Sequence, residues 1–371
     1  MAARQSPPVR AAHVGSLLRP PELKAARADR AAGRITAAQL RAAEDAAISR
    51  VVQRQEELGF GAVTDGEYRR DSWHMDFYKR IGGVVERGAA PLRFRNAETE
   101  VEYMMPSLQI EAKLHLPETI FAEDFTFLKS ATKKATPKLT IPSPSVLHRR
   151  AITALGNGAV YGTMEPFWAD LTAVYAEEVR RLGALGCTYL QIDDTSFATL
   201  CDPAQRTALS RAGADGEHVH ETYIRVFNDV LKAKPAGMTV ATHTCRGNHR
   251  SAWFASGGYD FIAEALFNEL EVDAFFLEYD DERSGGFEPL RFLPKGKFAV
   301  LGLVSTKQRG LESKDALKRR IEEAAKFAPL EQLCLSPQCG FSSTLEGNDL
   351  TEAEQFAKLG LLVEVARDIW G

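Results

Sequence analysis

The sequence lacks long apolar runs and any excess of basic residues. Among its 371 residues, 46 are Lys or Arg and 50 are Asp or Glu, which gives a formal net charge of −4. This balance does not indicate a nucleic-acid-binding surface. No apolar stretch approaches the roughly 20 residues of a membrane helix, and "MAARQSPPVRAAHVGS" lacks the apolar core of a secretion signal. We therefore expect a cytoplasmic protein with neither a nucleic acid nor a membrane as partner.

Cysteine is also scarce. Five cysteines, an odd number in a long chain, do not indicate a disulfide framework, so thiols remain available for metal binding or reaction. The chain is 44% hydrophobic and 26% charged, which is ordinary for a globular protein. No repeat, low-complexity tract or Pro/Ser linker divides it. We therefore expect a single domain over residues 1–371, and a homo-oligomer is compatible with the sequence.

Short β-rich runs alternate with helical patterns along the chain. Eight such runs occupy residues 10–16, 61–67, 138–144, 188–194, 239–245, 273–280, 298–305 and 332–340. The alternation predicts an α/β fold, in particular a (β/α)8 TIM barrel, with an open doubly wound sheet as the alternative. Polar, chemically competent residues end most of the runs, which favours the barrel because a barrel builds its active site there.

One interval between predicted strands is unusually long. Residues 68–137 separate the second run from the third, whereas a simple connection in an α/β fold is far shorter. We interpret this interval as an insertion over the barrel mouth. The basic segment "KKATPK", residues 133–138, is interpreted as a solvated turn, with attraction of an anionic tail on a ligand as the alternative.

The fifth run ends in "THTC", which places His243 and Cys245 two positions apart. Side chains at i and i+2 of a strand point to the same face, so the imidazole and the thiol converge. Such a pair also occurs where a core histidine lies beside a buried thiol, so further ligands are needed. Glu278 in "FFLEYDD" and Cys339 in "SPQCGF" end the sixth and eighth runs. The set His243, Cys245, Glu278 and Cys339 predicts a Zn²⁺ site, because thiolates and imidazole suit this ion.

The predicted ligand set indicates a particular chemistry. Two thiolates and a carboxylate around Zn²⁺ leave a negative net charge, which makes a poor centre for splitting water and a good holder of a substrate thiolate. Alkyl transfer to sulfur needs such a thiolate. The remaining cysteines, Cys187, Cys201 and Cys334, are not expected to be ligands.

Six motifs, in chain order, resemble one enzyme family. "HVGSLLRP", "TDGEYRR", "QIDD", "THTC", "FLEYDD" and "LSPQCG" are similar to the catalytic barrel of the cobalamin-independent methionine synthases, most closely to short single-barrel relatives. The resemblance implies a (β/α)8 barrel, zinc on the four ligands above, and methyl transfer to the thiol of homocysteine, as in a 5-methyltetrahydrofolate-homocysteine methyltransferase. It implies two partners, a small-molecule thiol and a methyl donor.

The resemblance also implies the residues that hold homocysteine. They are the segment from His13 to Ser16 together with Glu67 and Asp193, and we expect the two carboxylates to be the catalytic ones. Carboxylates suit the ammonium group of an amino acid, and the Ser16 hydroxyl offers a donor to its carboxylate. The alternative is that the acidic side chains form ion pairs with Arg69 or Arg70, since buried carboxylates are usually paired.

The sequence departs from the family on the methyl-donor side. The family's proton-donor histidine falls near Val304 or Ser305, and its pterin-binding glutamate falls near Thr199. His148 stands where the family stacks its folate on tryptophan, so we expect His148 to contact the substrate. His74 and His148 are further candidates for proton delivery, with an ordinary surface or hydrogen-bonded histidine as the alternative for each. The donor is therefore open between a folate and another methyl carrier, such as a corrinoid protein.

Two other functions fit a zinc site with thiolate ligands. Epoxyalkane:coenzyme M transferase has a similar barrel and opens an epoxide with a zinc-bound thiolate, but Glu67 and Asp193 would repel its sulfonate thiol. A structural zinc site in a binding protein would also use four ligands. The position of the ligands among carboxylates at a barrel mouth favours the enzyme.

Overall fold

The computed structural model describes residues 6–96, 99–155, 158 and 160–371. At its centre lies a six-stranded parallel sheet in the order β10-β9-β8-β7-β6-β5. The strands are β5 (Leu139–Pro142), β6 (Tyr189–Asp193), β7 (Thr239–Thr244), β8 (Ala274–Glu278), β9 (Phe298–Val304) and β10 (Leu333–Pro337). They are almost wholly buried, as expected for a parallel sheet made of near-continuous apolar runs. The protein thus has the expected α/β fold.

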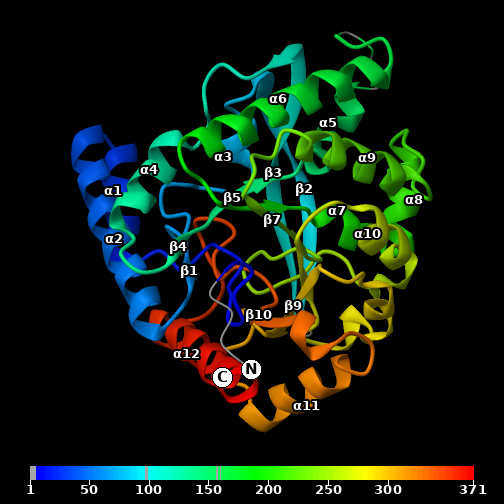
Figure 1. Cartoon of the computed structure of the whole chain (residues 1–371). Helices are drawn as coiled ribbons and strands as arrows, with labels where there is room; N and C mark the ends of the chain where they lie inside the picture. The colour runs from blue at the N-terminus through cyan, green and yellow to red at the C-terminus, as the bar shows by residue number, and fades with distance from the viewer. Residues whose placement is uncertain (1–5, 97–98, 156–157, 159) are drawn as a thin grey trace.

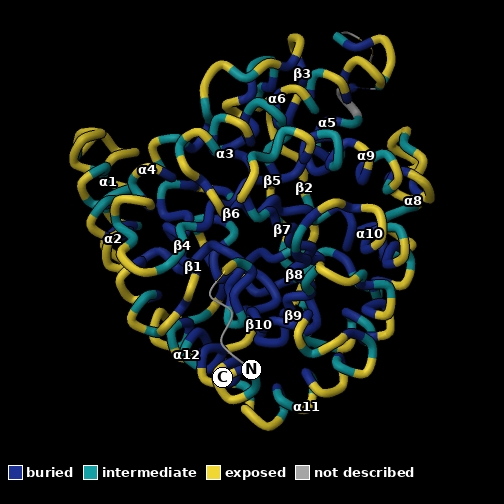
Figure 2. The backbone as a smooth tube through the Cα atoms, in the orientation of Figure 1, coloured by how far each residue is buried: buried dark blue, intermediate teal, exposed yellow. Residues whose placement is uncertain are grey.

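Helices surround this sheet (Figure 1). They are α1 (Pro21–Ala31), α2 (Ala37–Leu58), α3 (Met75–Tyr78), α4 (Ala122–Ala131), α5 (Pro144–Leu155), α6 (Met164–Ala184), α7 (Thr195–Leu200), α8 (Pro203–Arg211), α9 (Val219–Leu231), α10 (Ala263–Glu269), α11 (Lys314–Ala324) and α12 (Glu352–Trp370). Figure 2 shows the buried strands in the interior and exposed backbone at the periphery. None of the described helices is both long enough and apolar enough to cross a bilayer.

The two remaining predicted strands are only partly formed. The strand β1 (Ala62–Val63) pairs in parallel with β4 (Thr136–Pro137), which runs directly into β5. The first predicted strand flanks β10, where the Ala12 N–H donates to the Leu335 carbonyl at 2.9 Å. Among the described residues, no paired strands join residues 10–16 to β1, so the sheet is not closed. The closed eight-stranded barrel is therefore not confirmed, because these two runs contain too little extended backbone.

A long antiparallel hairpin lies within the interval 68–137. Its strands are β2 (Gly82–Arg95) and β3 (Glu100–His115), and β3 packs against α5 and α6 (Figure 1). The end of β2 is tied to the loop after β7, since the backbone groups of Arg95 and Trp253 exchange two hydrogen bonds of 2.8 Å. The hairpin thereby extends across the end of the sheet at which β7 stops.

Candidate active site

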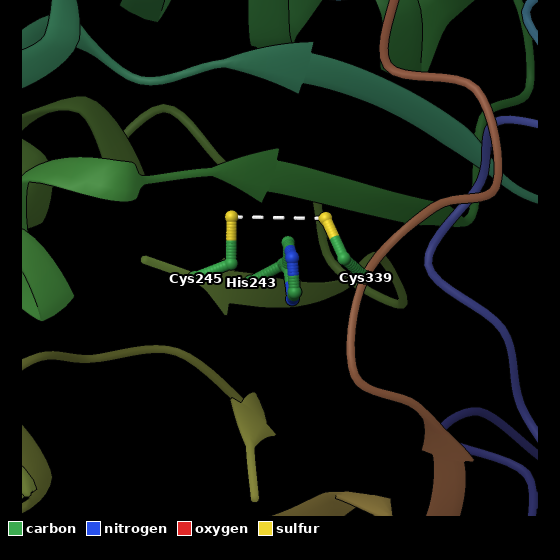
Figure 3. A group of neighbouring side chains, drawn as sticks. All are labelled: His243, Cys245 and Cys339. Carbon is green, nitrogen blue, oxygen red and sulfur yellow. Dashed lines mark hydrogen bonds between the residues drawn. The ribbon is translucent and has the colours of Figure 1, made fainter. Parts of the chain in front are cut away.

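Three of the four predicted metal ligands lie together at the carboxyl ends of the strands. His243 is on β7, Cys245 follows that strand directly, and Cys339 follows β10 (Figure 3). One ligand atom from each residue lies within 4.8 Å of the others, and all three side chains are buried. The Sγ atoms of Cys245 and Cys339 are 3.7 Å apart. Parallel strands bring these positions together because their carboxyl ends meet at one edge of the sheet.

The chemistry of this group fits a zinc ion. Two sulfurs each about 2.3 Å from a tetrahedral zinc are separated by about 3.8 Å, close to the 3.7 Å seen here. Neither ring nitrogen of His243 has a hydrogen-bond partner among the described residues, although the ring is buried. Buried polar atoms are normally satisfied, so a ligand for this imidazole is expected. The hydrogen bond between Cys339 and Cys245, together with the nearby His243, holds the pKa of Cys339 well below its usual range, which favours the thiolate that zinc binds.

Glu278, the fourth predicted ligand, is not part of this close group. Its carboxylate accepts a hydrogen bond of 2.7 Å from the Arg246 backbone N–H and forms ion pairs with Arg283 and Lys307. Burial alone would raise the pKa of Glu278, but Lys307, Arg283 and Arg246 outweigh it and hold the pKa below its usual range. The carboxylate is therefore ionised and is shared among three cationic side chains. Its role as a metal ligand stays a prediction.

A cavity of about 260 Å³ opens next to the His–Cys–Cys group. Leu92, Phe94, Tyr103 and Met105 of the β2–β3 hairpin line it, and they form a largely apolar wall. Its polar lining includes Ser16, Glu67, His74, Arg149, Arg150, Asp193, Thr195, Ser196, Thr199, Asn248 and His249. An apolar pocket with a few convergent polar groups is typical of a small-molecule site.

The two predicted catalytic carboxylates both face this cavity. Asp193 ends β6, and its Oδ1 accepts a hydrogen bond of 2.6 Å from Gln191 Nε2. Burial raises the pKa of Asp193 to about 7. Glu67 accepts a hydrogen bond of 2.8 Å from Thr140 at Oε1, whereas its buried Oε2 has no hydrogen-bond partner among the described residues. Arg70 lies 3.6 Å from Glu67, so the ion pair considered from the sequence is present for this carboxylate.

Beneath these carboxylates lies a lysine that the sequence interpretation placed wrongly. Lys138 ends the segment taken as a solvated turn, yet it is 2% exposed. Its Nζ donates to Gln191 Oε1 at 2.9 Å and to the Val14 carbonyl at 3.2 Å. Burial lowers the pKa of Lys138 to about 7, while Asp193 and Glu67 oppose this shift. The burial of Lys138 could have been predicted from the sequence, because this residue also begins the third β-rich run.

Ser16 lines the cavity, whereas the His13 side chain does not. The His13 Nε2 hydrogen-bonds to Gln55 Oε1 of α2 at 2.8 Å, and its ring lies edge-on to Phe60. Burial lowers the pKa of His13 to about 3, so the imidazole is neutral. The predicted substrate contact of this side chain is therefore not supported by the geometry, because alternation along the first run turns it toward α2.

His148 also lies outside the cavity lining. Its Nδ1 is 2.9 Å from the Tyr223 hydroxyl, and its ring lies 4.7 Å from that of Trp168. The predicted substrate contact of His148 is not supported, since α5 directs it into an aromatic cluster against α6 and α9. The next two residues of α5, Arg149 and Arg150, line the cavity instead. Sequence reasoning missed both arginines, although "HRR" placed them beside a residue already considered.

A parallel α/β sheet that gathers thiols, an imidazole and carboxylates beside one cavity defines an enzyme-type site at the carboxyl ends of its strands. Residues 150–368 match the family described as "Cobalamin-independent synthase, Catalytic domain". The chain belongs to this family, the cobalamin-independent methionine synthases.

Individual relatives cover nearly the whole chain. The protein YxjH of Bacillus subtilis (strain 168), which is itself uncharacterised, is 43% identical over 365 residues, 98% of this chain and 95% of YxjH. The crystal structure of a putative vitamin-B12-independent methionine synthase from Listeria monocytogenes is 35% identical, with a TM-score of 0.78, and covers 99% of this chain and 100% of its own. A methionine synthase from Shewanella sp. W3-18-1, solved with selenomethionine, is 17% identical and shares the fold with a TM-score of 0.73 over 97% of each chain.

Proposed function

We propose that the chain is a zinc-dependent methyltransferase whose acceptor is the thiol of homocysteine. The observation that carries this proposal is the His243–Cys245–Cys339 group, which borders the same cavity as Glu67 and Asp193. Membership of the cobalamin-independent methionine synthase family supports it. We further infer that the eight strand-like segments act as one barrel-like domain over residues 1–371.

In this proposal each group has one task. His243, Cys245 and Cys339 would hold the zinc, and Glu278 is the predicted fourth ligand. Bound zinc would lower the pKa of the acceptor thiol, so that the thiolate is available at neutral pH. The apolar hairpin wall keeps water away from this thiolate, which strengthens the electrostatic interactions around it.

The carboxylates would recognise the amino-acid end of the acceptor. The Oε2 of Glu67, which has no hydrogen-bond partner among the described residues, and the carboxylate of Asp193 would accept hydrogen bonds from an ammonium group in the cavity that both residues line. An ammonium beside Asp193 favours its ionised form and so opposes the effect of burial on its pKa. The Ser16 hydroxyl would donate to the carboxylate of the acceptor.

A second candidate keeps the zinc thiolate and changes the electrophile. The family's proton-donor histidine falls near Val304 or Ser305 in this chain, and the Ser305 hydroxyl donates to Asp280 Oδ2 at 2.9 Å. A serine bound in this way does not supply the proton that methyl transfer from a folate consumes. The electrophile is therefore not fixed as a folate, and an epoxide is the second candidate, as in epoxyalkane:coenzyme M transferase; the thiolate would open the ring at carbon, and the alkoxide formed would take its proton from solvent.

Calorimetry on the zinc-loaded protein tests both candidates. Homocysteine, coenzyme M and 3-mercaptopropionate would be titrated separately after zinc content is measured. We expect one zinc per chain and tightest binding of homocysteine. Tightest binding of coenzyme M would favour the second candidate. Tight zinc binding without affinity for any thiol would contradict both and indicate a structural metal site.

A further inference from the structure

Two adjacent arginines line the cavity without an acidic side chain in direct contact among the described residues. Arg149 and Arg150 of α5 are half-buried there. Within the described part of the chain, neither guanidinium has an ion pair or a hydrogen bond. This is unusual, since charged groups withdrawn from water are normally paired. The two arginines are neither members of the His243–Cys245–Cys339 group nor part of the carboxylate pair. The residue roles proposed above for homocysteine binding do not include them.

Both guanidinium groups remain charged at neutral pH. Burial lowers the pKa of Arg150 to about 10, and the charge of Arg149 adds to this effect. Burial also lowers the pKa of Arg149, although Tyr223 and Asp194 oppose it. Two neighbouring cations in a partly dry cavity repel each other, and an anion between them would relieve that repulsion.

A third polar group faces the same cavity. His74 is 1% exposed, and its Nδ1 lies 3.0 Å from the Ser72 hydroxyl. Its Nε2 is buried and has no hydrogen-bond partner among the described residues. Burial and the charge of Arg150 hold the pKa of His74 well below its usual range, so the ring is neutral. With the Ser72 hydroxyl donating to Nδ1, the Nε2–H is left to donate into the cavity.

These groups approach the cavity from a different side than the metal ligands. The arginines lie on α5, which follows β5, whereas the cysteines follow β7 and β10. In the sheet, β6 separates β5 from β7. Phe94 and Met105 of the hairpin line the same cavity. The cavity therefore combines a thiol site, an apolar wall and a cationic site, which suits two substrates bound side by side.

We propose that Arg149, Arg150 and His74 bind an anionic group on the second substrate, the molecule that supplies the methyl or alkyl group. This inference rests on the proposed function, which already assigns the carboxylates and Ser16 to the acceptor. A carboxylate, sulfonate or phosphate accepts paired N–H donors from a guanidinium, and such charge-assisted hydrogen bonds are strong. A donor that carries no anionic group would leave both cations unpaired.

Sulfate is a suitable probe for this site because it carries the anionic group alone. It would be titrated calorimetrically into the zinc-loaded full-length protein, with and without saturating homocysteine. We expect one sulfate per chain. Arg149→Gln and Arg150→Gln should each weaken sulfate binding about tenfold or more, the loss expected for a hydrogen bond to a charged group. Arg150→Lys keeps the charge and should weaken it less.

A matched control is the exposed Arg93 of the hairpin, whose side chain is 70% exposed beside Glu100. Arg93→Gln should leave sulfate binding unchanged. Homocysteine affinity should stay within about twofold of wild type in every variant, because the acceptor uses other groups. Circular dichroism would verify folding, and Arg150→Lys replaces Arg150→Gln in the comparison if the latter unfolds.

Several results would overturn the inference. One is that the wild type does not bind sulfate. Another is that Arg93→Gln weakens sulfate binding as much as the cavity variants do. A third is that the Arg149 and Arg150 variants lose homocysteine affinity in parallel with sulfate affinity. Competition between sulfate and coenzyme M for the wild type would assign the arginines to the acceptor and overturn it too. If homocysteine fails to bind wild type while sulfate binding depends on the arginines, the proposed acceptor is wrong and the anion site stands.

Discussion

The sulfur atoms of Cys245 and Cys339 lie 3.7 Å apart although 94 positions separate the two residues in the chain. The contact exists because β7 and β10 end at the same edge of the sheet. Neither cysteine alone makes a metal site, and the two together with His243 make a soft ligand set. The proposed metal binding therefore depends on the assembled fold.

Replacing either cysteine of the ligand group should remove the zinc ion. Cys245→Ser and Cys339→Ser are each expected to abolish stoichiometric zinc in the purified protein, measured by elemental analysis, while circular dichroism shows a folded chain. Cys201→Ala is the matched control, since this buried thiol lies on the C-terminal side of α7, outside the ligand group. Full zinc content in both serine variants would contradict the assignment.

Glu278→Gln separates an ion-pair role from a ligand role. The substitution leaves Arg246, Arg283 and Lys307 without their shared carboxylate. Because breaking a buried ion pair is costly, the free energy of unfolding of the metal-free protein should fall by about 3–5 kcal/mol in urea titrations. Zinc affinity, measured separately by chelator competition, should also fall. An unchanged zinc affinity would show that Glu278 serves the cations alone.

Asp193→Asn tests how the acceptor is recognised. Loss of the carboxylate charge should weaken homocysteine binding by about 1.5–3 kcal/mol, the value of a hydrogen bond to a charged group. The affinity for 3-mercaptopropionate, which lacks the amine, should hardly change in the same calorimetric titration. Equal weakening of both thiols would mean that Asp193 does not contact the ammonium group.

Glu178 should make stability depend on pH. This α6 carboxylate is buried and accepts hydrogen bonds of 3.0 and 3.1 Å from the Ile120 N–H, and burial raises its pKa to about 7. The Glu178 carboxyl group therefore keeps its proton up to a higher pH in the folded state than in the unfolded state. The stability that this protonated group contributes is lost as the pH rises toward 7 and above. Glu178→Gln avoids ionisation and should stabilise the protein at pH 8 by up to about 3 kcal/mol.

At pH 5 the same substitution should have little effect, because the carboxyl group is protonated in the folded protein. Urea unfolding at the two pH values would measure the difference. Glu177→Gln, one position earlier and paired with Arg181 on the outside of the helix, is the control and should show no such pH dependence. An equal effect of Glu178→Gln at both pH values would contradict the expectation.

Much of the sheet could be predicted from the sequence because buried parallel strands are short, apolar and bounded by loops. The run 239–245 corresponds to β7 at Thr239–Thr244, and the run 298–305 corresponds to β9 at Phe298–Val304. The run 61–67 yields only β1 at Ala62–Val63, since its second half turns at Gly66 and Glu67, which both have positive φ. Pattern alone does not reveal where such a turn begins.

The direction of individual side chains was harder to predict than their position along the chain. His243 and Cys245 could be placed together because two residues of one strand share a face. His148 and Arg149 are neighbours on a helix, and only the packing of α5 against α6 and α9 decides which one faces the cavity. Lys138 looked solvated because the exposed Lys133 and Lys134 precede it, and its burial depends on contacts with Gln191, which is distant in sequence.

The β2–β3 hairpin has a consequence for which second substrate the cavity accepts. Its side chains form one wall of the cavity but supply none of the thiol, imidazole or carboxylate groups beneath it. Exchanging Leu92, Phe94, Tyr103 or Met105 would change the shape of this wall without removing any of those groups. The hairpin is thus a selectivity wall: it would decide which second substrate fits the cavity, while residues elsewhere in the chain would carry the proposed sulfur chemistry.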